Sequence, residues 1–388
     1  MDKQNKQLLL ILTIGVFGIL TTEMGITGIL PALAEHFNIS ISKAGLLVSL
    51  FALAVAISGP TMPIFFSGIN RKTVMLLVLG IFVIGNIVSM FASNFTVLLV
   101  ARVVPAFFHP IYCSLALTVA ATSVSKEEAP KAVSKVILGV TAGMILGVPI
   151  TNFIANQTSI ELSILFFAIL NAIAFVATLI FVPSLPVIER LSYGAQIRVL
   201  KKPIVWLAIA TVIFIGSATS SINSFITEYL GTVTNITGNT LTLALFILGI
   251  SSLIGNLAGG NLLTKNAVKT AMFFPILLVI VHILSFFTGK STFPMMITIL
   301  LWGILFAISN NVSQYWITSA APEAPDFANG LFLAFSNLGI TFGTAVGGFF
   351  ISGMGTQYIV LGGIIFLVLS FVSILLRSYM YNTKIQSV

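Results

Sequence analysis

The chain has 388 residues, of which 57% are hydrophobic and 7% are charged, and its formal net charge is +8. This composition lies far outside the usage of soluble globular proteins. A single cysteine, Cys113, excludes an intrachain disulfide and any metal site built from several cysteines.

The first apolar segment, Leu8 to Leu30, contains one charged residue, Glu23. A bilayer core of about 30 Å takes about 20 helical residues to cross, so this segment is long enough to span it. The segment lacks a signal-peptide cleavage pattern, and we expect it to be retained as the first helix. The same criterion predicts twelve membrane-spanning helices, at 8–30, 44–66, 74–92, 96–122, 133–155, 162–182, 204–226, 240–262, 270–288, 293–319, 328–352 and 357–377.

The basic residues are distributed unevenly between the loops that join these helices. Most of the 18 lysines and arginines fall in loops on the side of the N-terminus, which predicts that both termini are cytoplasmic. Topology and contact with anionic lipids explain the positive charge, so we do not expect nucleic-acid binding. The longest polar connection predicts a six-helix bundle at 1–187, a cytoplasmic linker at 188–203 and a second six-helix bundle at 204–388.

An internal repeat relates the two halves at an offset close to 200 residues. Its clearest members are two stripes of glycines spaced by four, Gly139, Gly143 and Gly147 in one half and Gly339, Gly343 and Gly347 in the other. Such a stripe lies on one helix face and allows another backbone to approach closely. It indicates tight local packing, an interface at which two bundles rock, or both. Repeated six-helix units suggest a binding site near the midplane, and Pro149 can kink its helix.

Three of the ionisable residues inside the predicted spans, where charged groups are costly and usually functional, are the main candidates. Glu23 is a candidate proton carrier, because burial favours the protonated form of a carboxyl. The alternative is a structural carboxylate, paired with Arg102 or hydrogen-bonded to nearby hydroxyls. Arg102 and His109 lie seven residues apart, on one face of the predicted helix 96–122. For Arg102 the alternatives are coupling to Glu23 and a structural ion pair. For His109 they are titration near neutrality, substrate binding and a neutral structural histidine.

Amide and aromatic side chains form a second group of candidates. Amides orient a ligand by hydrogen bonds and aromatic rings stack on it, although each such residue alone is more often an interhelical contact. The candidates for substrate contact are Tyr112, Asn223, Asn256, Asn310, Asn311, Gln314, Tyr315, Trp316 and Asn337. The chain has no metal-ligand spacing and no nucleotide-binding module, so we expect no metal, no cofactor and no enzymatic activity.

Several motifs resemble those of a known family. They are Thr22-Glu23-Met24, Ala101-Arg102-Val103 with His109, the segment from Leu138-Gly139 to Gly147-Val148-Pro149, and the segment from Ala321 to Gly330. The chain resembles the major facilitator superfamily, and within it the drug:proton antiporter-1 group, in its arabinose- and sugar-efflux-like branch.

That resemblance covers essentially the whole chain and implies an all-α membrane protein of twelve helices in two six-helix pseudo-repeats, with alternating access and proton-coupled export. By matching position it assigns coupling to Glu23 and Arg102, and a bundle interface to Gly143, Gly147 and Pro149. The loop before residue 74 keeps the basic pair Arg71-Lys72 of the family's gating motif. It has Ser67-Gly68 where that motif has Asp-Arg.

The leading functional prediction is a secondary active transporter that exports drugs, sugars or related metabolites by proton antiport. Two alternatives remain open at this point: an uptake symporter or facilitator of a metabolite, and a non-transporting membrane receptor or scaffold. The expected partners are a small-molecule substrate, protons and membrane lipids. We expect a monomer in a bacterial cell membrane.

Overall fold

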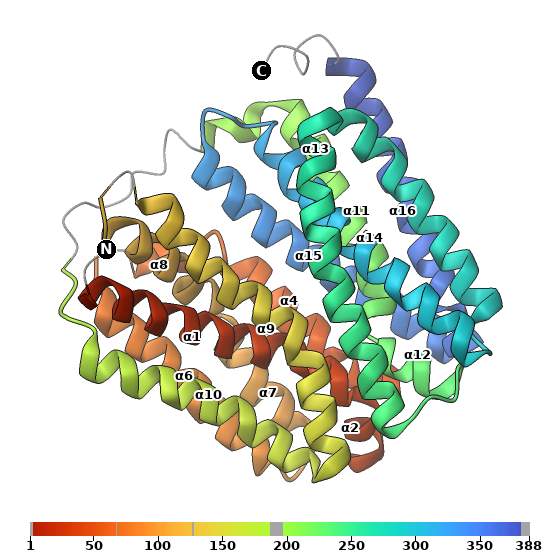
Figure 1. The fold of residues 1–388 in the computed structure, drawn as a ribbon, viewed down its shortest axis with the longest axis horizontal. Helices are drawn as coiled ribbons and strands as arrows, with labels where there is room; N and C mark the ends of the chain where they lie inside the picture. The colour runs from red at the N-terminus through yellow and green to blue at the C-terminus, as the bar shows by residue number, and fades with distance from the viewer. Residues whose placement is uncertain (1–2, 67, 126–127, 187–196, 382–388) are drawn as a thin grey trace. The chain divides into compact units, whose positions relative to one another are not determined.

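The computed structural model describes residues 3–66, 68–125, 128–186 and 197–381, and within these ranges the chain is helical and contains no strand (Figure 1). Eleven of the described helical runs are long and apolar enough to cross a membrane. Several helices begin at a polar residue that caps the free backbone amides of the first turn. Asn94 accepts from the Val97 amide at 3.0 Å, and Ser159 accepts from the Leu162 amide at 3.2 Å. The predicted all-α membrane fold is confirmed.

The contacts of the chain divide it into two compact units. The first comprises the described parts of 1–38 and 57–191. Its helices are α1 (Lys3–Gly25), η1 (Ile26–Ile29), α2 (Leu30–His36), α5 (Met62–Phe65), α6 (Arg71–Met90), α7 (Phe95–Ala106), α8 (His109–Thr122), α9 (Ala129–Gln157) and α10 (Ile160–Phe181).

The second unit comprises residues 39–56 and the described parts of 192–388. It holds α3 (Ile41–Ala44), most of α4 (Leu46–Ser58), η2 (Ile197–Lys201), α11 (Pro203–Asn223), α12 (Ile226–Thr232), α13 (Gly238–Thr288), α14 (Thr292–Thr318), α15 (Pro325–Met354), η3 (Thr356–Tyr358) and α16 (Ile359–Tyr381).

Residues 39–56 precede the predicted linker but pack on α15 of the second unit. The Ser42 hydroxyl donates to the Gly348 carbonyl at 2.6 Å, and the Thr341 hydroxyl donates to the Ser49 carbonyl at 3.2 Å. The contact-based division therefore differs from the predicted boundaries at this segment. Most of the predicted linker 188–203 lies outside the described residues.

One helix, α13, accounts for the difference between twelve predicted spans and eleven helical runs. Its 51 residues would extend about 76 Å if straight, more than twice a bilayer core of about 30 Å. The helix is broken at Asn266, whose φ of −161° and ψ of 94° are not helical. The Asn266 side chain accepts from the Lys269 amide at 2.9 Å and so caps the second segment. The predicted helices 240–262 and 270–288 are thus the two arms of α13.

The predicted helix 96–122, in contrast, is two helices in the structure. Two helices replace it, because α7 ends at Ala106 and α8 begins at His109. Prolines flank the break: Pro105 lies in the last turn of α7, and Pro110 lies in the first turn of α8. A residue before a proline is disfavoured in the helical conformation, which explains the irregular backbone here. His109 is therefore the first residue of a new helix. It does not lie two turns after Arg102 on one continuous helix, as the sequence spacing had predicted.

The glycine stripes show how closely the two halves repeat each other. A Cβ added at Gly143 would lie 2.8 Å from the Leu20 Cβ and 2.9 Å from the Phe17 carbonyl oxygen on α1. A Cβ added at Gly343 would meet the backbone of Ser217 on α11, with its Cα at 2.8 Å. Residues 17 and 217 differ by 200 in number, as do Gly143 and Gly343. The glycine and the residue that it contacts therefore both recur at the same offset in the second half.

The other members of the stripes follow the same relation. A Cβ at Gly147 would meet Thr21, and one at Gly347 would meet Ser221. Each stripe therefore packs against a helix of its own unit, where α9 meets α1 and α15 meets α11. A role for these glycines in gating or at an interface between the two bundles stays a prediction.

We expect Gly343→Leu to destabilise the protein by at least about 1–3 kcal/mol, because the new side chain would overpack the α11–α15 contact. Thermal unfolding in detergent, followed by size-exclusion chromatography, measures this effect. Gly353→Leu on the same helix is the matched control, since nothing lies within 4 Å of a Cβ built there. Equal stability of the two variants would contradict the close approach.

Candidate functional site

The carboxylate of Glu23 lies inside the first unit, in the last turn of α1. The residue is only 9% exposed. Its Oε2 atom lies 3.0 Å from Nε2 of His109, which is 3% exposed at the start of α8. The break between α7 and α8 places His109 at this point, so the prolines of the sequence help to set the geometry of the pair.

Arg102 on α7 lies beside the same pair. Its Nη2 atom donates to the carbonyl of Thr22 at 3.0 Å, and its positive charge is close enough to attract the Glu23 carboxylate. The Cys113 sulfur lies 3.8 Å from the His109 Nε2 atom. The structure thus brings together the three ionisable residues that the sequence singled out, with His109 as an ion-pair partner of Glu23.

Thr22, the neighbour of Glu23, is the point at which three further hydrogen bonds meet. Its hydroxyl donates to the Gly18 carbonyl at 2.9 Å, and it accepts from Asn171 at 3.0 Å and from Asn86 at 3.4 Å. A hydroxyl has one donor and two acceptor positions, so all of them are used here. We call Thr22, Asn86 and Asn171 the Thr22 node. It ties α1 to α6 and α10, and it holds the backbone that carries Glu23.

Sequence interpretation missed Asn86 and Asn171. Both are buried, at 3% and 0% exposed. The available signal was an amide within an otherwise apolar span, the same signal that selected the amides of the second half. Their partner Thr22 lies 64 and 149 residues away in sequence, and no local pattern identifies it.

The arrangement can hold and release a proton. A carboxylate, an imidazole and a guanidinium share a site from which water is largely excluded, so the charge of each strongly affects the others. We call these three groups the coupled set. Because the guanidinium stays charged, the variable members of the set are Glu23 and His109.

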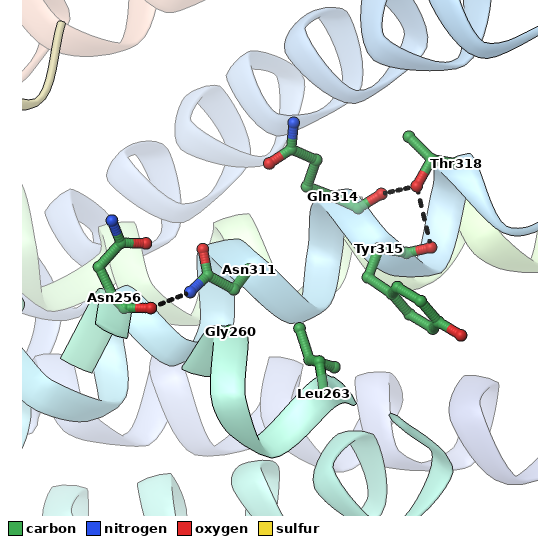
Figure 2. Close-up of a pocket in the computed structure, with 7 residues that line it drawn as sticks. All are labelled: Asn256, Gly260, Leu263, Asn311, Gln314, Tyr315 and Thr318. Carbon is green, nitrogen blue, oxygen red and sulfur yellow. Dashed lines mark hydrogen bonds between the residues drawn. The ribbon is translucent and has the colours of Figure 1, made fainter. Parts of the chain in front are cut away.

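The second unit contains a hollow of about 380 Å³ between α13 and α14 (Figure 2). It is lined by Asn256, Gly260, Leu263, Asn311, Gln314, Tyr315 and Thr318, and none of these is charged. The four residues from α14 lie at positions i, i+3, i+4 and i+7 and so share one helix face. The Asn311 amide donates to the Asn256 carbonyl at 2.8 Å and joins the two walls.

Four of the predicted substrate residues line this hollow: Asn256, Asn311, Gln314 and Tyr315. Trp316 does not, because it points to the other side of α14 and is fully buried. Tyr112 is likewise 0% exposed and lies against Gly15 in the first unit. In this structure both aromatic side chains contact protein, and their part in substrate binding stays a prediction.

The remaining predicted substrate residues are amides outside the lining of the hollow. Asn337 is buried on α15 and donates to the Leu333 carbonyl at 3.0 Å. Asn223 and Asn310 are half-buried, at the end of α11 and on α14. Their part in substrate binding stays a prediction.

The basic pair of the predicted gating loop begins α6. The Lys72 ammonium donates to the Leu179 carbonyl at 2.9 Å, and Arg71 donates to the Thr122 hydroxyl at 3.4 Å. Asn70 caps the helix by accepting from the Lys72 amide at 3.0 Å. These bonds join the ends of α6, α8 and α10 within the first unit, and a gating role for the pair stays a prediction.

Known proteins are similar to this chain over nearly its whole length. The sequence profile of the Major Facilitator Superfamily matches residues 12–326 and 215–386. The inner membrane transport protein YdhP of Escherichia coli (strain K12) is 30% identical over 360 residues, which are 92% of each chain. A probable sugar efflux transporter of Helicobacter pylori (strain G27) is 26% identical over 342 residues, 87% of each chain.

Among solved structures, a bacterial homologue of the human lysosomal transporter Spinster, in an inward-facing and unoccupied conformation, superposes with a TM-score of 0.83. It is 17% identical, and the match covers 99% of this chain and 98% of that one. A mutant of the nucleoside transporter NupG superposes with a TM-score of 0.78 at 16% identity, over 98% of this chain and 100% of that one. At these identities the likeness shows a shared fold.

We expect Thr22→Val and Asn171→Ala to be coupled in stability, because they remove the two ends of one hydrogen bond. Interhelical hydrogen bonds in membranes contribute about 0.6 kcal/mol on average and up to about 1.7 kcal/mol. A double-mutant cycle of unfolding free energies should give a coupling in that range. Additive effects of the two substitutions would show that the hydrogen bond contributes nothing.

Proposed function

Because the chain belongs to the major facilitator superfamily, we propose that it exports small uncharged molecules in exchange for protons carried by Glu23 and His109. The family and the relatives are transporters, so the chain is a transporter and not an enzyme. It is a multi-pass membrane protein with bacterial homologues. Export, proton coupling and the substrate class are the proposal.

The observation that carries the proposal is the 3.0 Å contact between the Glu23 carboxylate and the His109 imidazole inside a membrane-spanning unit. A structural ion pair would be served better by an arginine or a lysine, whose charge does not change near neutral pH. Histidine changes its charge between about pH 5 and 8. A buried acid–histidine pair is therefore suited to taking up and releasing a proton during a cycle.

In the proposed cycle the charge of Glu23 determines what holds α1 in place. When Glu23 is ionised, its attraction to His109 and Arg102 keeps α1 close to α7 and α8. A proton on Glu23 removes that attraction, and the helices can then adopt the other access state. A ligand or proton shifts such an equilibrium only through its different affinity for the two states, and this pair supplies such a difference.

The hollow in the second unit supports an uncharged, hydroxyl-bearing substrate. Its lining offers the side chains of Asn256 and Gln314 as donors and acceptors, the Thr318 hydroxyl oxygen as an acceptor, and Tyr315 as an aromatic surface. This combination suits small polar ligands that are fixed by hydrogen bonds and stacking. The relatives named as sugar efflux transporters agree with this class. Transport of a panel of neutral sugars and uncharged drugs into proteoliposomes with an imposed pH gradient tests it.

Orientation is part of the proposal, with both termini on the cytoplasmic side of a bacterial cell membrane. Uptake by symport is the runner-up, on the same residues. A pH gradient imposed across the vesicle membrane separates the two, because an acidic lumen drives substrate accumulation by a proton antiporter and substrate loss by a symporter.

We expect Glu23→Gln to abolish transport against a gradient, because the amide keeps the size of the side chain but carries no proton. Downhill exchange of substrate should remain, since the hollow lies in the other unit. Uptake into proteoliposomes with and without a pH gradient measures both, and expression in the membrane is the control. Undiminished uphill transport would remove Glu23 from the coupling role.

Arg102→Ala and His109→Ala should each move the pH dependence of transport to higher pH. Either change removes a neighbouring positive charge and makes the ionised form of Glu23 less favourable. Among the described residues, Arg102 and His109 interact with the carboxyl, and Cys113 contacts His109. His36→Ala, at the exposed end of α2, is the matched control. An unchanged pH midpoint in both test variants contradicts the coupled set.

A further inference from the structure

Arg377, near the end of α16, is fully buried. By its position in the sequence it belongs to the basic residues that set topology, and an exposed lysine would serve that purpose equally well. A buried guanidinium is costly unless its charge is compensated. Its burial therefore needs a separate explanation.

The guanidinium holds the last turn of α14. Its Nη1 atom donates to the Trp316 carbonyl, and its Nη2 atom donates to the Ser319 hydroxyl at 2.9 Å. The Ser319 hydroxyl in turn donates to the Trp316 carbonyl at 3.2 Å, which closes a ring of three hydrogen bonds. The Arg377 Cζ atom lies 4.3 Å from the centre of the Trp316 ring.

These contacts explain how the charge is accommodated. Among the described residues Arg377 forms no ion pair with an acidic side chain. The carbonyls at the C-terminus of α14 carry the negative end of the helix dipole, which favours a cation there. The face of the Trp316 indole attracts a cation as well. The planar guanidinium can donate to a carbonyl and a hydroxyl and stack on a ring at the same time, whereas a lysine ammonium is a single point charge.

The turn that Arg377 holds is also a wall of the hollow. Gln314, Tyr315 and Thr318 line the hollow on one face of α14 (Figure 2), while Trp316 and Ser319 meet Arg377 behind it. The Thr318 hydroxyl donates to the Gln314 and Tyr315 carbonyls at 2.9 and 3.2 Å, within the same turn. A shift of this turn would therefore move all three lining side chains together.

We propose that Arg377 is a positioning residue for substrate binding, which fixes the last turn of α14 and thereby the side chains of Gln314, Tyr315 and Thr318. The inference rests on the proposed function of the hollow as a substrate site. It adds a residue of α16 that lies outside the lining and that neither family resemblance nor composition selects.

The test compares Arg377→Lys and Ser319→Ala with Leu376→Ala, a half-exposed neighbour on α16. Ser319→Ala removes one acceptor of the Arg377 guanidinium and keeps its bond to the Trp316 carbonyl, so it stays informative if the arginine variant does not fold. The first readout is the rate at which N-ethylmaleimide labels Gln314→Cys in a Cys113→Ser background. The second is uptake of radiolabelled lactose into proteoliposomes with an imposed pH gradient.

We expect Arg377→Lys to change the labelling rate and to raise the KM for lactose by about 3- to 10-fold, because well-placed contacts lose affinity when displaced by a fraction of an ångström. Ser319→Ala should act in the same direction and more weakly. The pH midpoint of transport should not move in either variant, since the Glu23–His109 pair lies in the other unit. Leu376→Ala should leave all three quantities unchanged.

Gln314→Ala distinguishes the two ways in which the idea can fail. If Gln314→Ala raises the KM while Arg377→Lys and Ser319→Ala change neither KM nor labelling, the hollow binds substrate and the positioning role is overturned. If Gln314→Ala leaves the KM unchanged, the hollow is not the substrate site, and the proposed site and the inference both fall.

Discussion

An ionisable carboxyl in a membrane-spanning helix is the constraint from which most of the first unit follows. Burial removes most of the water that would solvate the ionised form, so Glu23 depends on partners supplied by the protein. Those partners come from α7 and α8, and they reach α1 because prolines interrupt the helix between Arg102 and His109. The backbone beside Glu23 is held in addition by the Thr22 node and by the close approach of Gly147 on α9.

The repeat explains why the two units share a backbone frame, and differences in their polar residues distinguish the two units. The glycine contacts of α9 with α1 recur in α15 with α11 at the same offset of 200 residues, so the backbone frame is shared. The polar content is not shared. Asn223 stands where the first half has Glu23, and the hollow of the second unit is lined by amides and a hydroxyl without a charge. In the proposed mechanism the first unit carries protons and the second carries substrate.

Sequence patterns predicted the helical membrane fold and the family, and they selected Glu23, Arg102 and His109 as candidates, because length, hydropathy and isolated charges are local properties. They did not predict where helices end inside a long apolar run. The break at Asn266 and the break before His109 depend on one cap and two prolines, which a hydropathy window averages away. They also did not predict partners far apart in sequence, such as Asn171 with Thr22, or the packing of residues 39–56 on α15.

The two buried cations differ in a way that bears on the transport cycle. Arg102 lies beside a carboxyl that can gain or lose a proton, so the attraction it feels changes with protonation. Arg377 is compensated by a carbonyl, a hydroxyl and an indole ring, none of which titrates near neutral pH. Its contacts therefore have the same strength in every protonation state. In the proposed cycle, a proton that weakens the contacts of Glu23 leaves this part of the second unit intact. A substrate site there would keep its geometry while the access state changes.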